Sequence, residues 1–238
     1  MTISAMTLLS EKSGITSVYV ALGPVVGFAA IVGFATWYGK RFERKLAQAR
    51  TAFLQEVGGI EYLPNTAARP SFGFFPDAKP GDQKTPYSYA VQFSRSGYDV
   101  LAVEQDLGKH REYKYRYTVE IQIRIPPCPT LWMKQRGFGM VGPPDELIPL
   151  SLPAGPSFLF ATSNERFARM LFNENVAEII HNRLKGHVLE TVLENGIART
   201  PVPADRLDGR GVLPATDELI AFLRALPQRT WEYAKDHR

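Results

Sequence analysis

The chain has 238 residues, of which 45% are hydrophobic and 22% charged, and its formal net charge is +4. This balance excludes a chain that is disordered along its whole length, and the small positive excess argues against a nucleic-acid-binding domain. Cys128 is the single cysteine, which excludes a disulfide framework and a cysteine-based metal site and fits a reducing compartment.

An uncharged apolar segment occupies residues 18–38. As a helix that rises about 1.5 Å per residue, this segment reaches about 31 Å, which matches a bilayer hydrocarbon core of about 30 Å. We therefore expect a transmembrane helix over residues 18–38, after a short extracytoplasmic N-terminus at residues 1–17.

Interfacial aromatic residues and then cations follow this segment. Trp37 and Tyr38 are typical of a membrane–water interface, and the cations after them are Lys40, Arg41, Arg44 and Lys45. The positive-inside rule then places the N-terminus outside and the large C-terminal part in the cytoplasm of a single-pass protein of the cell membrane. These residues are expected to contact the membrane surface, with the cations drawn to anionic lipid headgroups.

A cleaved signal peptide is the competing interpretation, because Gly33-Phe34-Ala35 forms a small-x-small cleavage pattern. The apolar run is long for a signal peptide, its N-terminal flank is not clearly basic, and the cations after it resist translocation. A buried helix of a soluble protein fits the length and the flanking charges less well.

Small residues recur within the apolar segment. Gly23 and Gly27 form Gly-x-x-x-Gly, and Ala29 and Gly33 repeat the spacing. Small residues allow close approach of two helix backbones in lipid, so this surface is a candidate for helix–helix packing. Glycine and alanine are also simply common in membrane helices.

A juxtamembrane helix is expected over residues 39–58, because apolar residues such as Phe42, Leu46, Phe53 and Val57 recur at three- and four-residue spacing. Gly58-Gly59 should end it. The helix either packs on its own domain or pairs with a second copy of the chain, and its few heptads give the pairing weak support.

Proline and glycine mark residues 64–86 as a long irregular connection. Phe72, Phe74 and Phe75 within it should pin the connection to the folded domain. An exposed aromatic patch for a partner is the alternative.

The residues that follow have the pattern of β-strands. Residues 87–93 and 98–104 flank a glycine-containing turn, and apolar and polar residues alternate over 113–125, which predicts a strand with one buried and one solvated face. A hairpin turn near Gly108 should join this strand to the preceding one.

The C-terminal half mixes both patterns. Short strands are expected at 131–134 and 157–161, a helix capped by Ser163 over 166–172, a helix at 175–185, a hairpin of 187–193 and 197–201 around Asn195-Gly196, and a last helix capped by Thr216 or Asp217. Residues 59–226 should therefore form a cytoplasmic α+β domain, in which C-terminal helices cover a mainly antiparallel sheet, with residues 227–238 as a frayed helix or tail.

The chemical motifs are weak. Residues 137–142 fit Gly-x-Gly-x-x-Gly, but Pro143 and Pro144 replace the helix start that a dinucleotide site needs. The four histidines lack metal-ligand spacing, Cys128 lies between prolines without a nearby histidine, and the basic–aromatic stretch 109–117 shares the strand pattern, so its tyrosines should be buried. No catalytic, cofactor-binding or metal-binding residue is assigned, and no cofactor and no nucleic-acid partner is expected.

The leading hypothesis is a membrane-anchored, non-catalytic accessory or scaffold subunit of a membrane protein complex. Its partners would be another membrane protein or a second copy, contacted through the transmembrane helix. The alternatives are a membrane-tethered enzyme whose site assembles from distant residues and an exported domain released by cleavage after Ala35.

Overall fold

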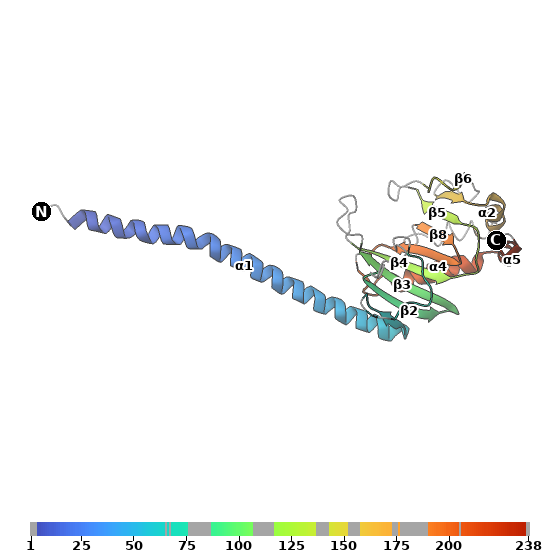
Figure 1. Ribbon diagram of the computed structural model, residues 1–238, viewed down its shortest axis with the longest axis horizontal. Helices are drawn as coiled ribbons and strands as arrows, with labels where there is room; N and C mark the ends of the chain where they lie inside the picture. Colours follow the sequence, from blue (N-terminus) through green and yellow to red (C-terminus); the bar gives the residue numbers. More distant parts are fainter. Residues whose placement is uncertain are drawn as a thin grey trace. The chain divides into compact units, whose positions relative to one another are not determined.

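The computed structural model describes residues 4–64, 66, 68–75, 87–106, 117–136, 143–151, 158–172, 176, 190–204 and 206–236, with side chains described from residue 28 onward. The chain divides into two compact units, Met1–Ala49 and Arg50–Arg238. The second unit contains all the strands (Figure 1).

One helix, α1 (Ser4–Val57), includes both the apolar segment and the predicted juxtamembrane helix (Figure 1). It ends where the glycine pair predicts, because Gly58 has a φ of +60° and its N–H donates to the carbonyl of Leu54 at 3.0 Å. Among the described residues, no helix combines the length and the apolarity that crossing a bilayer requires. The side chains of residues 18–27 lie outside that set, so the transmembrane helix at 18–38 stays a prediction.

The strands of the described residues form one nine-stranded sheet in the order β1-β2-β3-β4-β9-β8-β5-β7-β6, and every paired neighbour is antiparallel. The strands are β1 (Ile60–Tyr62), β2 (Tyr89–Arg95), β3 (Tyr98–Asp106), β4 (Tyr117–Arg124), β5 (Leu131–Gln135), β6 (Ile148–Leu150), β7 (Phe158–Thr162), β8 (Glu190–Glu194) and β9 (Ile197–Val202).

Two hairpin turns fix the register of neighbouring strands. Ser96 and Gly97 join β2 to β3 with φ of 54° and 86°, and Asn195 and Gly196 join β8 to β9 with φ of 51° and 80°. Positive φ at both central residues is the two-residue turn whose twist matches that of the strands. The Asn-Gly hairpin is confirmed as predicted, and the β2–β3 turn is two residues shorter than expected.

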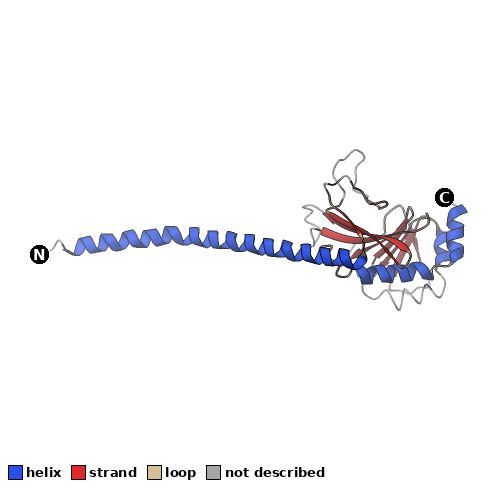
Figure 2. Cartoon of the chain, turned by 90° about the horizontal axis from the view of Figure 1, so that it is seen from below, coloured by secondary structure: helices blue, strands red, loops and turns tan. Residues whose placement is uncertain are grey.

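Helices cover one face of this sheet (Figure 2). They are α2 (Glu165–Leu171), α4 (Val212–Ala225), α5 (Gln228–Asp236) and the last turns of α1. Phe53 of α1, Phe167 of α2 and Phe222 of α4 join the fully buried Ile121 and Ile123 of β4 in the main core. The predicted α+β domain, a mainly antiparallel sheet with helices, is confirmed.

The helix starts differ from the prediction. Asn164, not Ser163, caps α2, since its side-chain oxygen accepts from the N–H of Phe167 at 2.9 Å. Helix α4 begins at Val212, so Thr216 lies inside it and donates to the carbonyl of Val212 at 2.8 Å. The left-handed Gly211 before the helix allows this earlier start, and Asp217 pairs with Arg95 instead of capping.

The C-terminal segment is part of the folded domain, whereas the sequence predicts a frayed helix or tail. Residues 228–236 form α5, in which Ala234 and Thr230 are fully buried. The guanidinium of Arg166 on α2 lies 5.5 Å from the ring centre of Tyr233 on α5. This cation–π contact joins the final helix to α2.

Some predictions fall on residues outside the described part of the chain. They are the turn near Gly108, the first residues of the strand 113–125, the glycine motif 137–142, most of the helix 175–185, and His110, His181, His187 and His237.

Candidate functional site

The first candidate surface is the exposed side of α1 before the domain. The large apolar side chains from residue 28 to 42 are exposed, for example Phe28 at 70%, Ile31 at 68% and Phe34 at 65%. Trp37 and Tyr38 are exposed as well, and the guanidinium of Arg41 lies 5.3 Å from the Trp37 ring centre. Such a concentration of exposed apolar groups is unusual for a surface that stays in water.

The predicted packing and membrane-surface residues share this helix. Ala29 is exposed, and a Cβ placed on Gly33 would meet no atom within 4 Å. The environments of Gly23 and Gly27 lie outside the described residues. The four cations that follow the apolar stretch are all exposed: Lys40, Arg41, Arg44 and Lys45.

A buried carboxylate, Glu104 on β3, fixes the end of α1 within the second unit. Glu104 has no exposed surface and accepts from Arg50 at 2.8 Å and from Arg206 at 2.9 Å. The backbone N–H of Leu207 at 2.8 Å and the hydroxyl of Ser88 at 2.7 Å complete the cluster. Elements far apart in sequence therefore converge on one side chain.

The pKa of Glu104 reflects these partners. Burial alone would raise it, but the hydrogen bonds from Leu207, Ser88 and Arg206 and the charge of Arg50 together hold this pKa below its usual value. Each arginine also stacks on an aromatic ring: Arg50 lies 3.9 Å from the Tyr89 ring centre and Arg206 lies 3.4 Å from that of Tyr117. The ionised carboxylate is thus a stabilising part of the domain.

The opposite face of the sheet is covered at one end by residues 71–75. Phe72 and Phe75 pack on a small cluster that includes Leu101 and Val103, which confirms that the aromatic residues pin this connection to the domain. The side chain of Gln122 on β4 bonds both main-chain groups of Phe74, with distances of 2.7 and 2.9 Å.

The prediction that β4 has a solvated face is therefore wrong in part. Gln122 has no exposed surface and the side chain of Glu120 is only 13% exposed. The sequence pattern identified the alternation correctly, but covering by residues 71–75 and by neighbouring side chains removes most of the solvent from the polar face.

Beyond this covered end lies a groove of about 870 Å³. Its floor is the sheet itself, with Trp132 of β5, Val192 of β8 and Arg199 of β9 in one row across neighbouring strands. Phe74 lies on one side, and residues 143–147 lie on another. We call this space the acidic groove, because its other lining side chains include Asp145, Glu146, Glu190 and Glu194.

Ion pairs order the floor of the acidic groove. Arg199 bonds Glu120 at 3.2 Å and lies 3.6 Å from Glu194, and its guanidinium is 4.6 Å from the Phe74 ring centre. Glu190 accepts from the indole N–H of Trp132 at 2.8 Å. Burial outweighs the attraction of Arg199 and the hydrogen bond from Gln122, so the pKa of Glu120 is raised.

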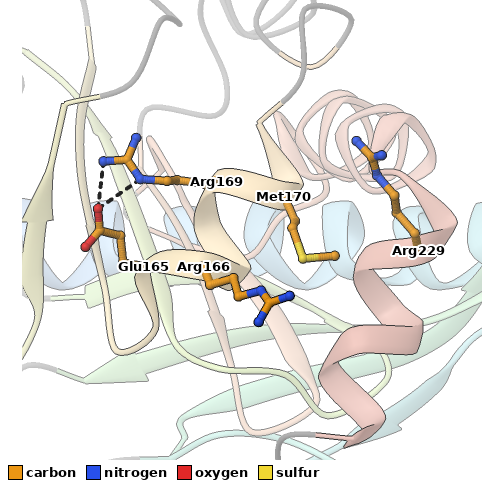
Figure 3. A pocket seen from close by; sticks show the side chains of 5 residues that line it. All are labelled: Glu165, Arg166, Arg169, Met170 and Arg229. Carbon is orange, nitrogen blue, oxygen red and sulfur yellow. Dashed lines mark hydrogen bonds and ion pairs between the residues drawn. The ribbon is translucent and has the colours of Figure 1, made fainter.

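A second hollow, of about 680 Å³, lies between α2 and α5 (Figure 3). Met170 lies between Arg166 on its own helix and Arg229 on α5, and Arg169 turns away to bond Glu165 at 2.6 and 2.9 Å. These arginines are exposed, and the hollow has no buried polar group among the residues that line it. The described lining residues therefore provide positively charged side chains but no buried polar groups arranged to bind a ligand.

The described residues hold no group of three or more His, Cys, Asp or Glu side chains placed to bind a metal ion. Burial raises the pKa of the Cys128 thiol to about 12, which keeps it protonated near neutral pH and makes it a poor nucleophile. Among the described residues, the best-defined features are thus surfaces and ion pairs. Neither Glu104 nor the acidic groove could be assigned from sequence, since no local motif marks them.

No protein-family model matches the chain, and no curated protein matches it in sequence. Its fold is similar to that in the crystal structure of the mycobacterial trehalose monomycolate transport factor A, TtfA. The two are 13% identical, with a TM-score of 0.53 over 77% of this chain and 97% of that chain. At this identity the likeness concerns the fold alone.

Proposed function

We propose that the protein is a membrane-anchored, non-catalytic accessory or scaffold subunit of a membrane complex, with residues 18–38 in the lipid and the α+β domain in the cytoplasm. The observation that carries the proposal is the apolar surface of α1 over residues 28–38, which no described part of the chain covers. Lipid or another apolar helix would remove this surface from water.

The residues after the apolar surface support the same arrangement. Exposed cations in the next turns favour contact with anionic headgroups, at about 1 kcal/mol for each cation near the surface. The helix continues without a break into the domain, where Phe53 is 2% exposed and Arg50 bonds Glu104.

The accessory part of the proposal draws on the remaining features. The described residues offer surfaces and ion pairs, and burial raises the pKa of the Cys128 thiol. The similar fold belongs to a protein described as a transport factor, and an accessory role in a transport assembly is the version of the proposal that this likeness favours.

The test compares two glycines with equal space around them. Gly33 and Gly39 both have no atom within 4 Å of an added Cβ, and at 3.6 residues per turn Gly39 lies about 120° around the helix from Gly33. We expect Gly33→Leu to lower the recovery of partner or the size of the assembly in mild detergent, measured by native mass spectrometry. Gly39→Leu should leave both unchanged.

Two results would contradict the proposal. A monomer without any partner in mild detergent would remove the accessory role. Digestion of the C-terminal domain by protease added to intact cells, or a mature N-terminus at Thr36, would remove the proposed location.

A further inference from the structure

The acidic groove has the architecture of a binding site for an extended chain. Its floor is formed by adjacent strands β5, β8 and β9 (Figure 1), where the buried Trp132 and Val192 lie in register with the half-buried Arg199. Its walls come from two separate connections, at Phe74 and at residues 143–147. A backbone hydrogen bond of 3.0 Å from Leu147 to Pro144 closes the turn of the second wall, and Leu147 packs on the Trp132 cluster.

Negative charge is in excess among the described residues that line this groove. Four carboxylates line it, at Asp145, Glu146, Glu190 and Glu194, and among the described lining residues the cation is the guanidinium of Arg199. Glu190 also lies 3.7 Å from the ammonium of the buried Lys134. Arg199 is already engaged by Glu120 and Glu194. Asp145 and Glu146 are exposed on the wall, and among the described residues no ion pair engages them. The groove therefore has a surplus of negative charge although the chain as a whole is positive.

We propose that the acidic groove binds an extended, lysine- or arginine-bearing segment of a partner protein. The cationic side chains would pair with the carboxylates of the groove, and apolar side chains of the segment would rest on the exposed or half-exposed Phe74, Pro144 and Leu147. This inference deepens the proposed accessory function and rests on it, because it assigns the surface through which the domain would hold its partner.

Other occupants fit the same surface less well. An anionic headgroup or an acidic peptide would meet four carboxylates and a guanidinium that already has its partners. A purely apolar chain would leave the carboxylates of the wall facing apolar surface, which costs free energy unless they are paired. A cationic segment that also has apolar side chains matches both the charge of the groove and its apolar lining.

The experiment uses the full chain in detergent and, as the probe, a capped peptide of alternating lysine and valine. We expect saturable binding by calorimetry that weakens as salt rises from about 50 to about 300 mM. The matching peptide of alternating glutamate and valine should not bind. The three indole N–H signals of selectively labelled tryptophan locate the site: that of Trp132, which is bonded to Glu190, should shift, and those of Trp37 and Trp231 should not.

A charge-matched pair of variants tests the assignment. Asp145→Asn with Glu146→Gln removes two exposed carboxylates from the wall and should weaken binding about three- to tenfold, given the usual worth of exposed ion pairs. Glu56→Gln with Glu232→Gln removes two exposed carboxylates from the helices α1 and α5 and should leave the affinity unchanged. Thermal unfolding of both variants confirms that the fold is retained.

The inference is overturned if the lysine peptide fails to bind at low salt, if both double variants bind it equally, or if the Trp132 signal stays in place. These outcomes are separate from those of the membrane proposal. If the chain keeps its assembly and its location but does not bind the peptide, only the groove assignment is contradicted.

Discussion

Two glutamates on neighbouring strands, one fully buried and one 13% exposed, show how differently the two faces of the sheet are built. Glu104 of β3 lies opposite Val119, and Glu120 of β4 lies opposite Val103, so the carboxylates are one register position apart. Because side chains alternate along a strand, Glu104 points to the face covered by helices and Glu120 to the face that holds the acidic groove.

The pKa of the glutamate side chain is lowered on the helix face and raised on the groove face. Donors from three other segments surround Glu104 and lower its pKa, whereas Glu120 has Arg199 and Gln122 and its pKa is raised by burial. The helix face is thus completed by the chain itself. On the groove face, the carboxylates have fewer hydrogen-bond and ion-pair partners within the chain. This is expected of a surface to which a partner binds.

The largest expected effect is on the helix face, at Phe53. Its ring lies 5.9 Å from that of Phe93 at an interplanar angle of 85°, and it fills space beside Gly209, where an added Cβ would lie 2.8 Å from it. Phe53→Ala should lower the free energy of unfolding by about 3–5 kcal/mol.

The matched variant on the groove face is Phe72→Ala. Phe72 is only partly buried, so its loss should cost about 1 kcal/mol. Urea unfolding followed by circular dichroism measures both. Equal losses of unfolding free energy in the two variants would show that both faces contribute alike to stability and would contradict the difference between them.

The next effect concerns Glu104. Glu104→Gln keeps the shape but removes the charge that Arg50 and Arg206 face, so we expect a loss of about 2–4 kcal/mol near neutral pH. The folded pKa lies below the ordinary 4.5, so the contribution of the carboxylate is present above that pH and is lost as the pH falls through the folded pKa.

The stability difference between wild type and Glu104→Gln should therefore shrink in acid. Urea midpoints measured at pH values on both sides of 4.5 provide the test. A difference that is constant with pH would mean that Glu104 acts through its shape and not through its charge.

The sequence predicted the elements whose signals are local. The period of two in β4, the Asn195-Gly196 turn and the glycines after α1 each depend on a few adjacent residues, and each is confirmed. Helix α4 starts earlier than the sequence predicts. Thr216 is a good cap by residue type, but the left-handed Gly211 and the burial of the first turn decide the start.

The candidate site could not be found in this way. Glu104 meets Arg206 and Leu207 across about one hundred residues, and the acidic groove combines residues of β5, β8, β9 and two connections. Glu120 and Gln122 have the alternation of a solvated face, and only the folded chain shows that residues 71–75 cover it. Residues that are distant in sequence can bury a side chain without any change in the local sequence pattern.

The smallest expected effect is at Glu120, and its sign separates the two faces. A raised pKa means that the folded state disfavours the carboxylate, so wild-type stability should fall as the pH rises from 4.5 through the folded pKa. Glu120→Gln removes this titration, and Arg199 keeps Glu194 as a partner at 3.6 Å. Near neutral pH the variant should lie within about 1 kcal/mol of wild type and gain on it as the pH rises. A loss as large as that of Glu104→Gln, measured in the same urea series, would show that the groove face is as fully satisfied as the helix face and would leave no reason for a partner to complete it.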